Sequence, residues 1–359
     1  MVKTLDKYFI DLFFKKLLML SIIFFSLSFT LTIFEEITFL SESSSAFYLP
    51  FLLAIFNAPT TLIEIFPFII LISAQLFFID LIKKKEDELI KINNLNNLYL
   101  IKVLSLCSFL FGILIITVYY PISSKFKFIY SDIKNVYSDD GKYLKHLNDN
   151  GIWIKDEINN EIFIINGVSK KDPFLEDVFI SKFNNNFDLI ENIFAKNVDI
   201  TNDQWVIENP IIFKDNRQTR IAKNIVLNTH FNIDKINSSF RNLNSFNLFQ
   251  LIDIKNENKL LGYSSQDIDL HFLKIISLPI YFSILAIISS LIMLNIKKNK
   301  PYIFHVLLGI SLSVIIYYIN NIFNVFGLTN KIPIYLSIFF PMIFLGIISI
   351  IGLIRINEK

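Results

Sequence analysis

The chain has one cysteine, Cys107, among 359 residues, and only four histidines. A single cysteine excludes an intrachain disulfide, so any domain outside a membrane must fold around its own core. The histidines lie far apart in the sequence and have no metal-ligand spacing; they are His146, His230, His271 and His305. The sequence contains no Gly-x-x-x-x-Gly-Lys-Ser/Thr phosphate loop and no Ser/His/Asp cluster. We therefore expect no ATP hydrolysis by this chain, no catalytic residues, no metal and no cofactor. The net charge of +2 is too small to indicate a nucleic-acid partner.

Long apolar runs dominate what is present. Six of them are long enough to cross a hydrocarbon core of about 30 Å at about 1.5 Å per residue; they cover residues 17–34, 60–82, 98–120, 273–295, 302–326 and 333–354. A polar stretch rich in Asn, Asp and Lys separates the third run from the fourth. This layout predicts an α-helical membrane protein with three plus three spans and one large extramembrane domain. We expect an N-terminal membrane half (1–125), the domain (126–265) and a C-terminal membrane half (266–359).

Lysine placement indicates the orientation. Lysines precede span one and follow spans two and four, whereas residues 35–58 contain no Lys or Arg. Short loops rich in Lys and Arg remain in the cytoplasm, so we expect both termini inside and residues 126–265 outside. Span one is also compatible with a signal peptide, but its apolar run is longer than usual and no small-x-small site ends it. The lysines concerned are Lys3, Lys7, Lys15, Lys16, Lys83, Lys84, Lys85, Lys91, Lys297, Lys298 and Lys300.

The segment 83–97, KKKEDELIKINNLNN, is too charged to span a membrane. Its apolar residues Leu89, Ile92 and Leu95 follow helical spacing, with charged residues on the other side. This pattern predicts a short amphipathic helix at the cytoplasmic face. A solvated connection with basic topology signals is the alternative.

The polar insert contains short runs typical of β-strands. Residues 151–155 and 161–166 flank Asn159-Asn160, a plausible hairpin turn. Residues 204–208, 211–214 and 221–228 are further candidates, whereas 174–198 and 245–260 are ambiguous. The insert therefore reads as an all-β domain. We expect Trp153 and Trp205 to be core anchors.

Ionisable residues inside spans are candidates for function. Glu64 and Asp80 lie near the two ends of span two. The alternative interpretation is that their side chains reach the membrane interface and have no functional role. Span five carries a polar stripe that is also a candidate for function; the alternative interpretation is that its side chains form hydrogen bonds between helices. The stripe comprises His305, Tyr317, Tyr318, Asn320, Asn321 and Asn324.

Several of these segments together resemble one family. The run 58–68, with Pro59 and Pro67 eight residues apart, and Glu88-Leu89 in the segment 83–97 are similar to the LptF/LptG permeases of the lipopolysaccharide export ABC transporter. Asn96 stands where that family usually has Gly, and Asn also tolerates the left-handed conformation that ends a helix. The remaining similar segments are 5–8, 151–154, 204–206, 277–279, Gly309, Pro333 and Pro341. The two tryptophan motifs and Phe34-Glu35-Glu36 resemble the LptG type more than the LptF type.

The resemblance implies a bacterial inner-membrane permease subunit with a periplasmic β-jellyroll-like domain. It implies as partners an LptF-like permease half, an LptB-like ATPase dimer and an LptC-like single-span periplasmic protein, with lipopolysaccharide as substrate. The ATPase would contact the segment 83–97, through Lys84, Asp87, Glu88, Leu89 and Ile92. Spans one and five would line the substrate cavity. We expect its contacts to include Phe34, Glu35, Phe68, Leu71, Tyr317, Tyr318 and Asn321.

Three alternatives remain at this stage. The chain could be the LptF-type paralogue in the same transporter. It could be a membrane sensor with a ligand-binding periplasmic domain, although its cytoplasmic segments are short for signalling. It could also be an assembly protein without transport, which co-purification with an ATPase would exclude.

Overall fold

The computed structural model describes most of the chain, and its residues form two compact units. The membrane unit comprises Met1–Lys127 and Gln266–Lys359, and the β unit comprises Phe128–Ser265. The described residues are 2–41, 46–84, 96–137, 152–171, 173–214, 217–220, 223–233, 235–236, 241–260, 264–294 and 301–357.

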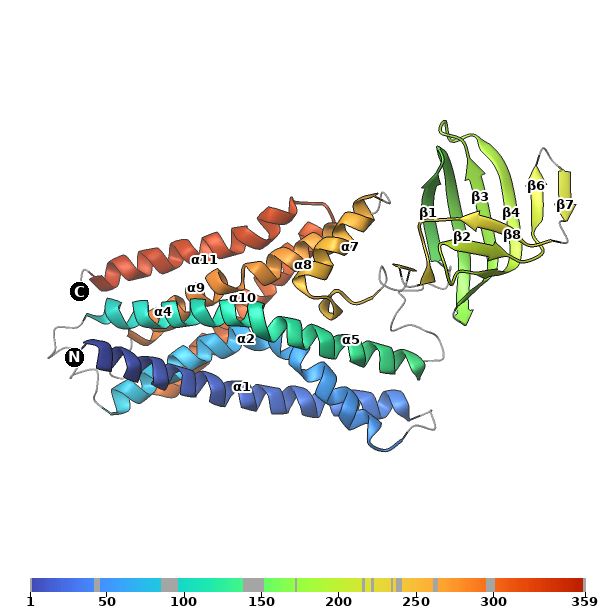
Figure 1. The fold of residues 1–359 in the computed structure, drawn as a ribbon. Coiled ribbons are helices and arrows are strands. Elements are labelled where there is room, and N and C mark those ends of the chain that lie inside the picture. The colour runs from blue at the N-terminus through green and yellow to red at the C-terminus, as the bar shows by residue number, and fades with distance from the viewer. Residues whose placement is uncertain are drawn as a thin grey trace. The chain divides into compact units, whose positions relative to one another are not determined.

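The membrane unit is a bundle of long apolar helices (Figure 1). Five helices of the described residues are long and apolar enough to span a membrane, and the bent pair α8–α9 makes six. This confirms the expected membrane α-helical class. The helices that form or enter the bundle are α1 (Val2–Leu40), α2 (Leu49–Lys83), α4 (Asn97–Leu114) with α5 (Tyr120–Val136), α8 (Gln266–Ile276), α9 (Leu278–Leu294), α10 (Tyr302–Leu328) and α11 (Ile334–Asn357).

Three helices differ from the simple spans that hydropathy predicts. α1 begins at Val2, well before the apolar run, because charged residues such as Lys7 and Asp11 are tolerated on a helix outside the hydrocarbon. α4 continues through a π-helical turn, η1 (Ile115–Tyr119), into α5, far beyond the expected end at residue 120. The fourth span bends by 51° between α8 and α9. Pro279, at the start of α9, has no N–H to continue the helical ladder, which accounts for the break.

Small residues let the two membrane halves approach closely. A Cβ added to Gly112 of α4 would lie 2.5 Å from the Cα of Pro279 in α9. Nearby, the hydroxyls of Ser105 and Ser283 are 2.6 Å apart, also joining α4 to α9. Helices in membranes associate mainly through such close packing and hydrogen bonds, because lipid supplies little hydrophobic driving force. The contact between α4 and α9 therefore holds the N-terminal and C-terminal halves together.

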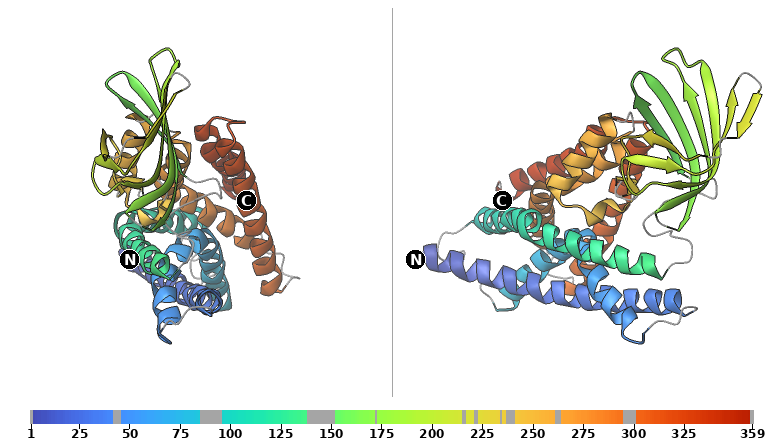
Figure 2. Two further views of the ribbon diagram at one scale, coloured as in Figure 1. Left: turned by 90° about the vertical axis from the view of Figure 1, so that its right-hand side faces the viewer. Right: turned by 45° about the vertical axis from the view of Figure 1, so that its right-hand side comes forward.

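The β unit is one curved antiparallel sheet. Its strand order is β1-β2-β3-β4-β5-β8, with β6 paired to β4 and β7 paired to β6. Figures 1 and 2 show β5 and β8 crossing the longer strands, so that the sheet forms a half-barrel. The strands are β1 (Ile152–Ile158), β2 (Glu161–Lys171), β3 (Phe174–Phe183), β4 (Leu189–Asp199), β5 (Gln204–Ile207), β6 (Ile211–Lys214), β7 (Arg217–Arg220) and β8 (Ile225–Asn228). The short helix η2 (Leu243–Ser245) and α7 (Leu248–Leu260) follow the sheet.

The hairpin turn expected at Asn159-Asn160 is confirmed. It joins β1 to β2, which pair from Ile158–Glu161 outward. Both asparagines have positive φ, 51° and 64°. Two consecutive left-handed residues are what a two-residue type I′ turn requires, and Asn tolerates that conformation. The ambiguous stretch 174–198 forms most of β3 and β4, and 245–260 is largely helical.

Trp205 anchors the core of the β unit, but Trp153 does not. The Trp205 side chain is fully buried, and its Nε1 donates to the carbonyl of Phe231 at 2.7 Å. The expectation for Trp153 is wrong, because its side chain is 61 % exposed. In β1 the side chains of Ile152, Ile154 and Asp156 point inward, and the two-residue period of a strand then directs Trp153 outward.

The inward carboxylate of Asp156 is buried with four hydrogen bonds. It accepts from the hydroxyl of Thr229 at 2.7 Å and from the amide of His230 at 3.0 Å. It also lies 2.8 Å from Nδ1 of His230 and accepts from the amide of Glu157 at 2.9 Å. Because a buried carboxylate needs such partners, this network fixes the segment after β8 against β1.

Candidate functional site

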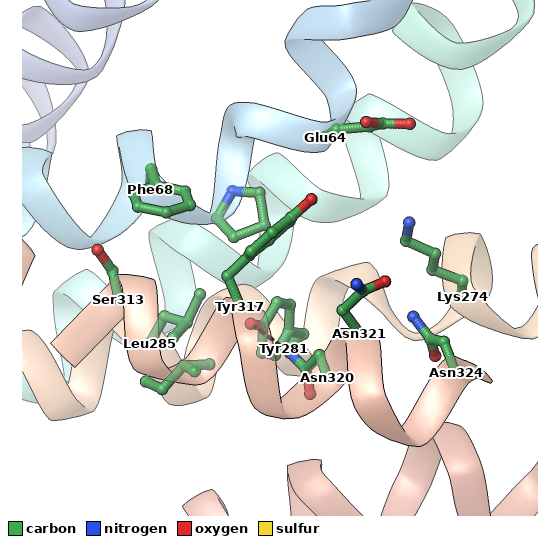
Figure 3. A pocket seen from close by; sticks show the side chains of 12 residues that line it. Glu64, Phe68, Lys274, Tyr281, Leu285, Ser313, Tyr317, Asn320, Asn321 and Asn324 are labelled. Atoms are coloured by element: carbon green, nitrogen blue, oxygen red, sulfur yellow. Dashed lines mark hydrogen bonds between the residues drawn. The ribbon is translucent and has the colours of Figure 1, made fainter. Parts of the chain in front are cut away.

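A pocket in the membrane unit brings together residues of α2, α8, α9 and α10 (Figure 3). α2 is far in the sequence from the consecutive helices α8, α9 and α10, so the pocket depends on the packing of the two membrane halves. Its lining residues are Glu64, Pro67, Phe68, Lys274, Tyr281, Leu285, Ser313, Ile316, Tyr317, Asn320, Asn321 and Asn324.

The pocket has a polar end and an apolar end. Figure 3 shows Glu64 and Lys274 at the same end, near Asn324, and Phe68 and Leu285 at the other. The rings of Phe68 and Tyr317 lie 6.2 Å apart, which joins α2 to α10 along one wall. A cavity with charged and amide groups at one end and hydrocarbon at the other matches an amphiphilic ligand.

The depth of the polar end follows from the lengths of the helices. Glu64 and Asn321 each lie about 20 residues, or roughly 30 Å of helix, from the end of their span that adjoins a lysine cluster, and Lys274 lies beyond the 51° bend between α8 and α9. That distance is about the thickness of the hydrocarbon core. The polar end therefore lies near the membrane boundary opposite the lysine clusters, and the apolar end lies within the hydrocarbon.

A buried side chain on α2 positions α10. Gln75 is fully buried, and its Nε2 donates to the carbonyl of His305 at 3.0 Å. One turn further along α10, a Cβ added to Gly309 would lie 1.9 Å from the same Nε2. Gly309 thus leaves the space in which the Gln75 amide sits. His305 itself is buried here and is not among the pocket-lining residues.

The polar stripe of span five divides in the structure. The Asn320 amide donates to the Tyr281 hydroxyl at 2.8 Å, so this residue joins α10 to α9, as the hydrogen-bonding alternative proposed. Asn321 and Asn324 line the pocket and make no side-chain hydrogen bond with the described part of the chain. Their amides are available to a ligand.

The structure brings three of the seven expected cavity residues to this pocket: Phe68, Tyr317 and Asn321. Tyr318 is exposed next to Tyr317, and Phe34 and Glu35 are exposed near the end of α1. Leu71 is fully buried, and its carbonyl accepts from Ser289 of α9 at 2.8 Å, so the pocket does not reach its side chain.

Span two contains two acids, Glu64 and Asp80, and the structure gives them different surroundings. Asp80 forms an ion pair with Lys16 of α1 at 2.5 Å, close to the end of α2. Glu64 lines the pocket instead, together with Lys274, which the sequence did not single out. Their equal separation from the lysine clusters was the available signal, but their proximity depends on helix packing.

The expected ATPase-contact segment begins where α2 ends. Lys84 is the one expected contact residue of this segment that the structure describes, and its Nζ lies 3.4 Å from the Tyr8 hydroxyl of α1. Asp87, Glu88, Leu89 and Ile92 lie outside the described residues.

The chain matches one family model over almost its whole length. The model of the family described as "Lipopolysaccharide export system permease LptF/LptG" matches residues 7–355. No individual curated protein matches at a significant level.

Proposed function

Since the chain belongs to the lipopolysaccharide export system permease family LptF/LptG, we propose that it is the LptG-type half of a transporter with two different permease subunits. It is a permease subunit of a lipopolysaccharide ABC transporter family and not a catalytic subunit. The two tryptophan segments and Phe34-Glu35-Glu36 support the LptG type. An LptF-like permease half, an LptB-like ATPase dimer and an LptC-like protein are the proposed partners.

The observation that best supports a lipid path in this chain is the pocket between α2, α9 and α10. A lipid with several acyl chains needs a broad apolar wall, and burial of that surface contributes about 25 cal/mol per Å². Phe68, Leu285 and Ile316 supply apolar surface at one end, and Asn321 and Lys274 supply polar groups at the other. We propose that acyl chains contact Phe68 and Tyr317 while the headgroup lies at the polar end.

Four expected cavity residues lie outside the pocket lining, and the proposal gives each of them another place. Phe34 on α1 is 65 % exposed, and we propose that it contacts lipid outside the pocket lining, as do Glu35 and Tyr318. Leu71 is buried behind the wall and would support the contact of α2 with α9.

The lysine distribution supports an inner-membrane protein with both termini in the cytoplasm and the β unit in the periplasm. In this orientation the polar end of the pocket lies at the periplasmic side of the inner membrane. Lipid extraction from the outer leaflet requires a headgroup site at that level.

Coupling to ATP hydrolysis is proposed to use Lys84, Asp87, Glu88, Leu89 and Ile92, because the chain has no phosphate-binding loop of its own. We expect the wild-type chain, purified in mild detergent, to retain an ATPase and a second permease-like chain. Glu88→Lys reverses the charge at the proposed contact and is expected to lower the retained ATPase severalfold, or to leave hydrolysis without export. Quantitative mass spectrometry of the purified complex and an export assay measure both effects.

Glu257→Gln, at an exposed position of α7 in the β unit, is the control for loss of one acid elsewhere. Normal export and normal ATPase recovery with Glu88→Lys would refute the assignment of the segment. A wild-type chain that retains no ATPase at all would count against the transporter itself. The identity of the second permease chain decides between the LptG and the LptF type.

A further inference from the structure

The pocket contains one cation and one anion among its lining residues. Lys274 contributes the ammonium group and Glu64 contributes the carboxylate, and the other ten lining residues are uncharged. These two groups come from α8 and α2, and they do not form an ion pair with each other. Figure 3 shows both side chains at the polar end with space between them. The site is thus neutral overall but carries separated charges.

Separated charges near a membrane boundary are costly unless a ligand or solvent compensates them. Both side chains are exposed in this chain, so solvent compensates their charges until a ligand displaces it. A ligand that placed an anion at Lys274 and a cation at Glu64 would compensate both. A ligand with only anionic groups would compensate Lys274 and be repelled by Glu64.

A divalent cation bridging Glu64 to a phosphate is less well supported by the lining. Calcium takes six to eight oxygen ligands, and magnesium binds through carboxylates, phosphates and several waters. Glu64 is the single carboxylate in the lining, and the described residues contain no group of three potential metal-ligating side chains. An amine needs only one carboxylate and a few neutral acceptors, which Asn321 and Asn324 supply through their carbonyl oxygens.

We infer that this pocket selects a lipid whose headgroup phosphate carries a primary amine, a zwitterionic group, over the same lipid with unmodified phosphates. In this arrangement Lys274 binds the phosphate and Glu64 binds the ammonium group. The inference rests on the proposed function, since it assigns the headgroup chemistry of that same lipid. It makes Glu64 a specificity-determining residue and Lys274 a general affinity residue.

The test compares two lipids on the full-length chain purified with its retained subunits and placed in nanodiscs. The probes are lipopolysaccharide with unmodified lipid A phosphates and the same molecule with phosphoethanolamine on one phosphate. Displacement of a fluorescent lipopolysaccharide gives the apparent Kd of each, with EDTA present to remove bridging cations. We expect the amine-bearing lipid to bind about tenfold more tightly, which corresponds to about 1.4 kcal/mol.

Variants separate the two charges. Glu64→Gln should remove the preference while the unmodified lipid binds at least as tightly as before, which also shows that the variant folds. Glu64→Asp keeps a carboxylate and should keep the preference. Lys274→Gln should weaken both lipids. Glu257→Gln and Lys102→Gln, which change exposed residues outside the lining, should keep the wild-type ratio.

Equal affinities for the two lipids in the wild type would overturn the inference and leave the proposed function standing. A preference that survives in Glu64→Gln would overturn it as well. So would tight binding of the unmodified lipid in a parallel series without EDTA, if EDTA abolishes that binding. If Glu64→Gln binds neither lipid, the ratio in Glu64→Asp decides: a tenfold ratio supports the inference and equal affinities contradict it. A wild-type complex that binds neither lipid would remove the proposed function together with the inference.

Discussion

Gly112→Val is expected to destabilise the membrane unit by about 1–3 kcal/mol, the usual cost of overpacking a tight interface. The added Cβ would lie 2.5 Å from the Cα and 2.9 Å from the N of Pro279. Backbone atoms cannot move aside as the end of a side chain can, so α4 and α9 must separate. Because α9 carries Tyr281 and Leu285, the pocket should lose its shape together with the contact. The measurement is the temperature at which the detergent-solubilised protein loses its monodisperse peak.

Gly346→Val on α11 is the matched control. A Cβ at that position would meet only the Cδ1 of Ile284, at an ordinary 3.9 Å. The control should melt close to the wild type. Equal melting of Gly112→Val and the wild type would show that the α4–α9 contact is looser than this structure has it.

Single cysteines at Asn159 and Asn295 should give an all-or-none difference in labelling. In a Cys107→Ser background, an impermeant thiol reagent applied to cells with a permeable outer membrane should label position 159 and leave position 295 unlabelled. Asn159 is the exposed turn of the β1–β2 hairpin, so access is not limited by burial. Position 295 belongs to the lysine-bearing loop that the orientation assigns to the cytoplasm. The reverse pattern would contradict the orientation and would place the polar end of the pocket on the wrong side for extraction.

The membrane-spanning helices could be predicted from the sequence, because a run of about 20 apolar residues has few stable alternatives to a membrane helix. The ends of these helices were not readable. α1 extends to Val2 and α5 to Val136, since helix can continue in water once it leaves the hydrocarbon. The strands β1 and β2 were found from alternation on either side of Asn159-Asn160, whereas β3 and β4 combine apolar and charged residues without a clean period. The expectation for Trp153 rested on the tendency of large aromatic side chains to be buried, whereas the alternation of its neighbours in β1 directs it outward.

Residues of the candidate site could be predicted from the sequence only where a single span carried the pattern. Phe68, Tyr317 and Asn321 were expected from the family resemblance, the last two also from the polar stripe of span five, and all three line the pocket. Lys274 lies near the start of span four, and no sequence pattern singled it out. Its place opposite Glu64 depends on the packing of α8 and α9 against α2, and no sequence pattern encodes that contact directly.

The most direct test of the central claim, that this pocket receives lipopolysaccharide, is photo-crosslinking from two equally accessible positions. Tyr317 in the pocket is 49 % exposed, and Ile348 on α11 outside the lining is 44 % exposed. A photoreactive amino acid at each position meets membrane lipid to a similar extent, so general contact predicts equal crosslinking. The account predicts that position 317 traps lipopolysaccharide in actively exporting cells and that position 348 traps little. Equal yields at the two positions, or trapping only at 348, would contradict it.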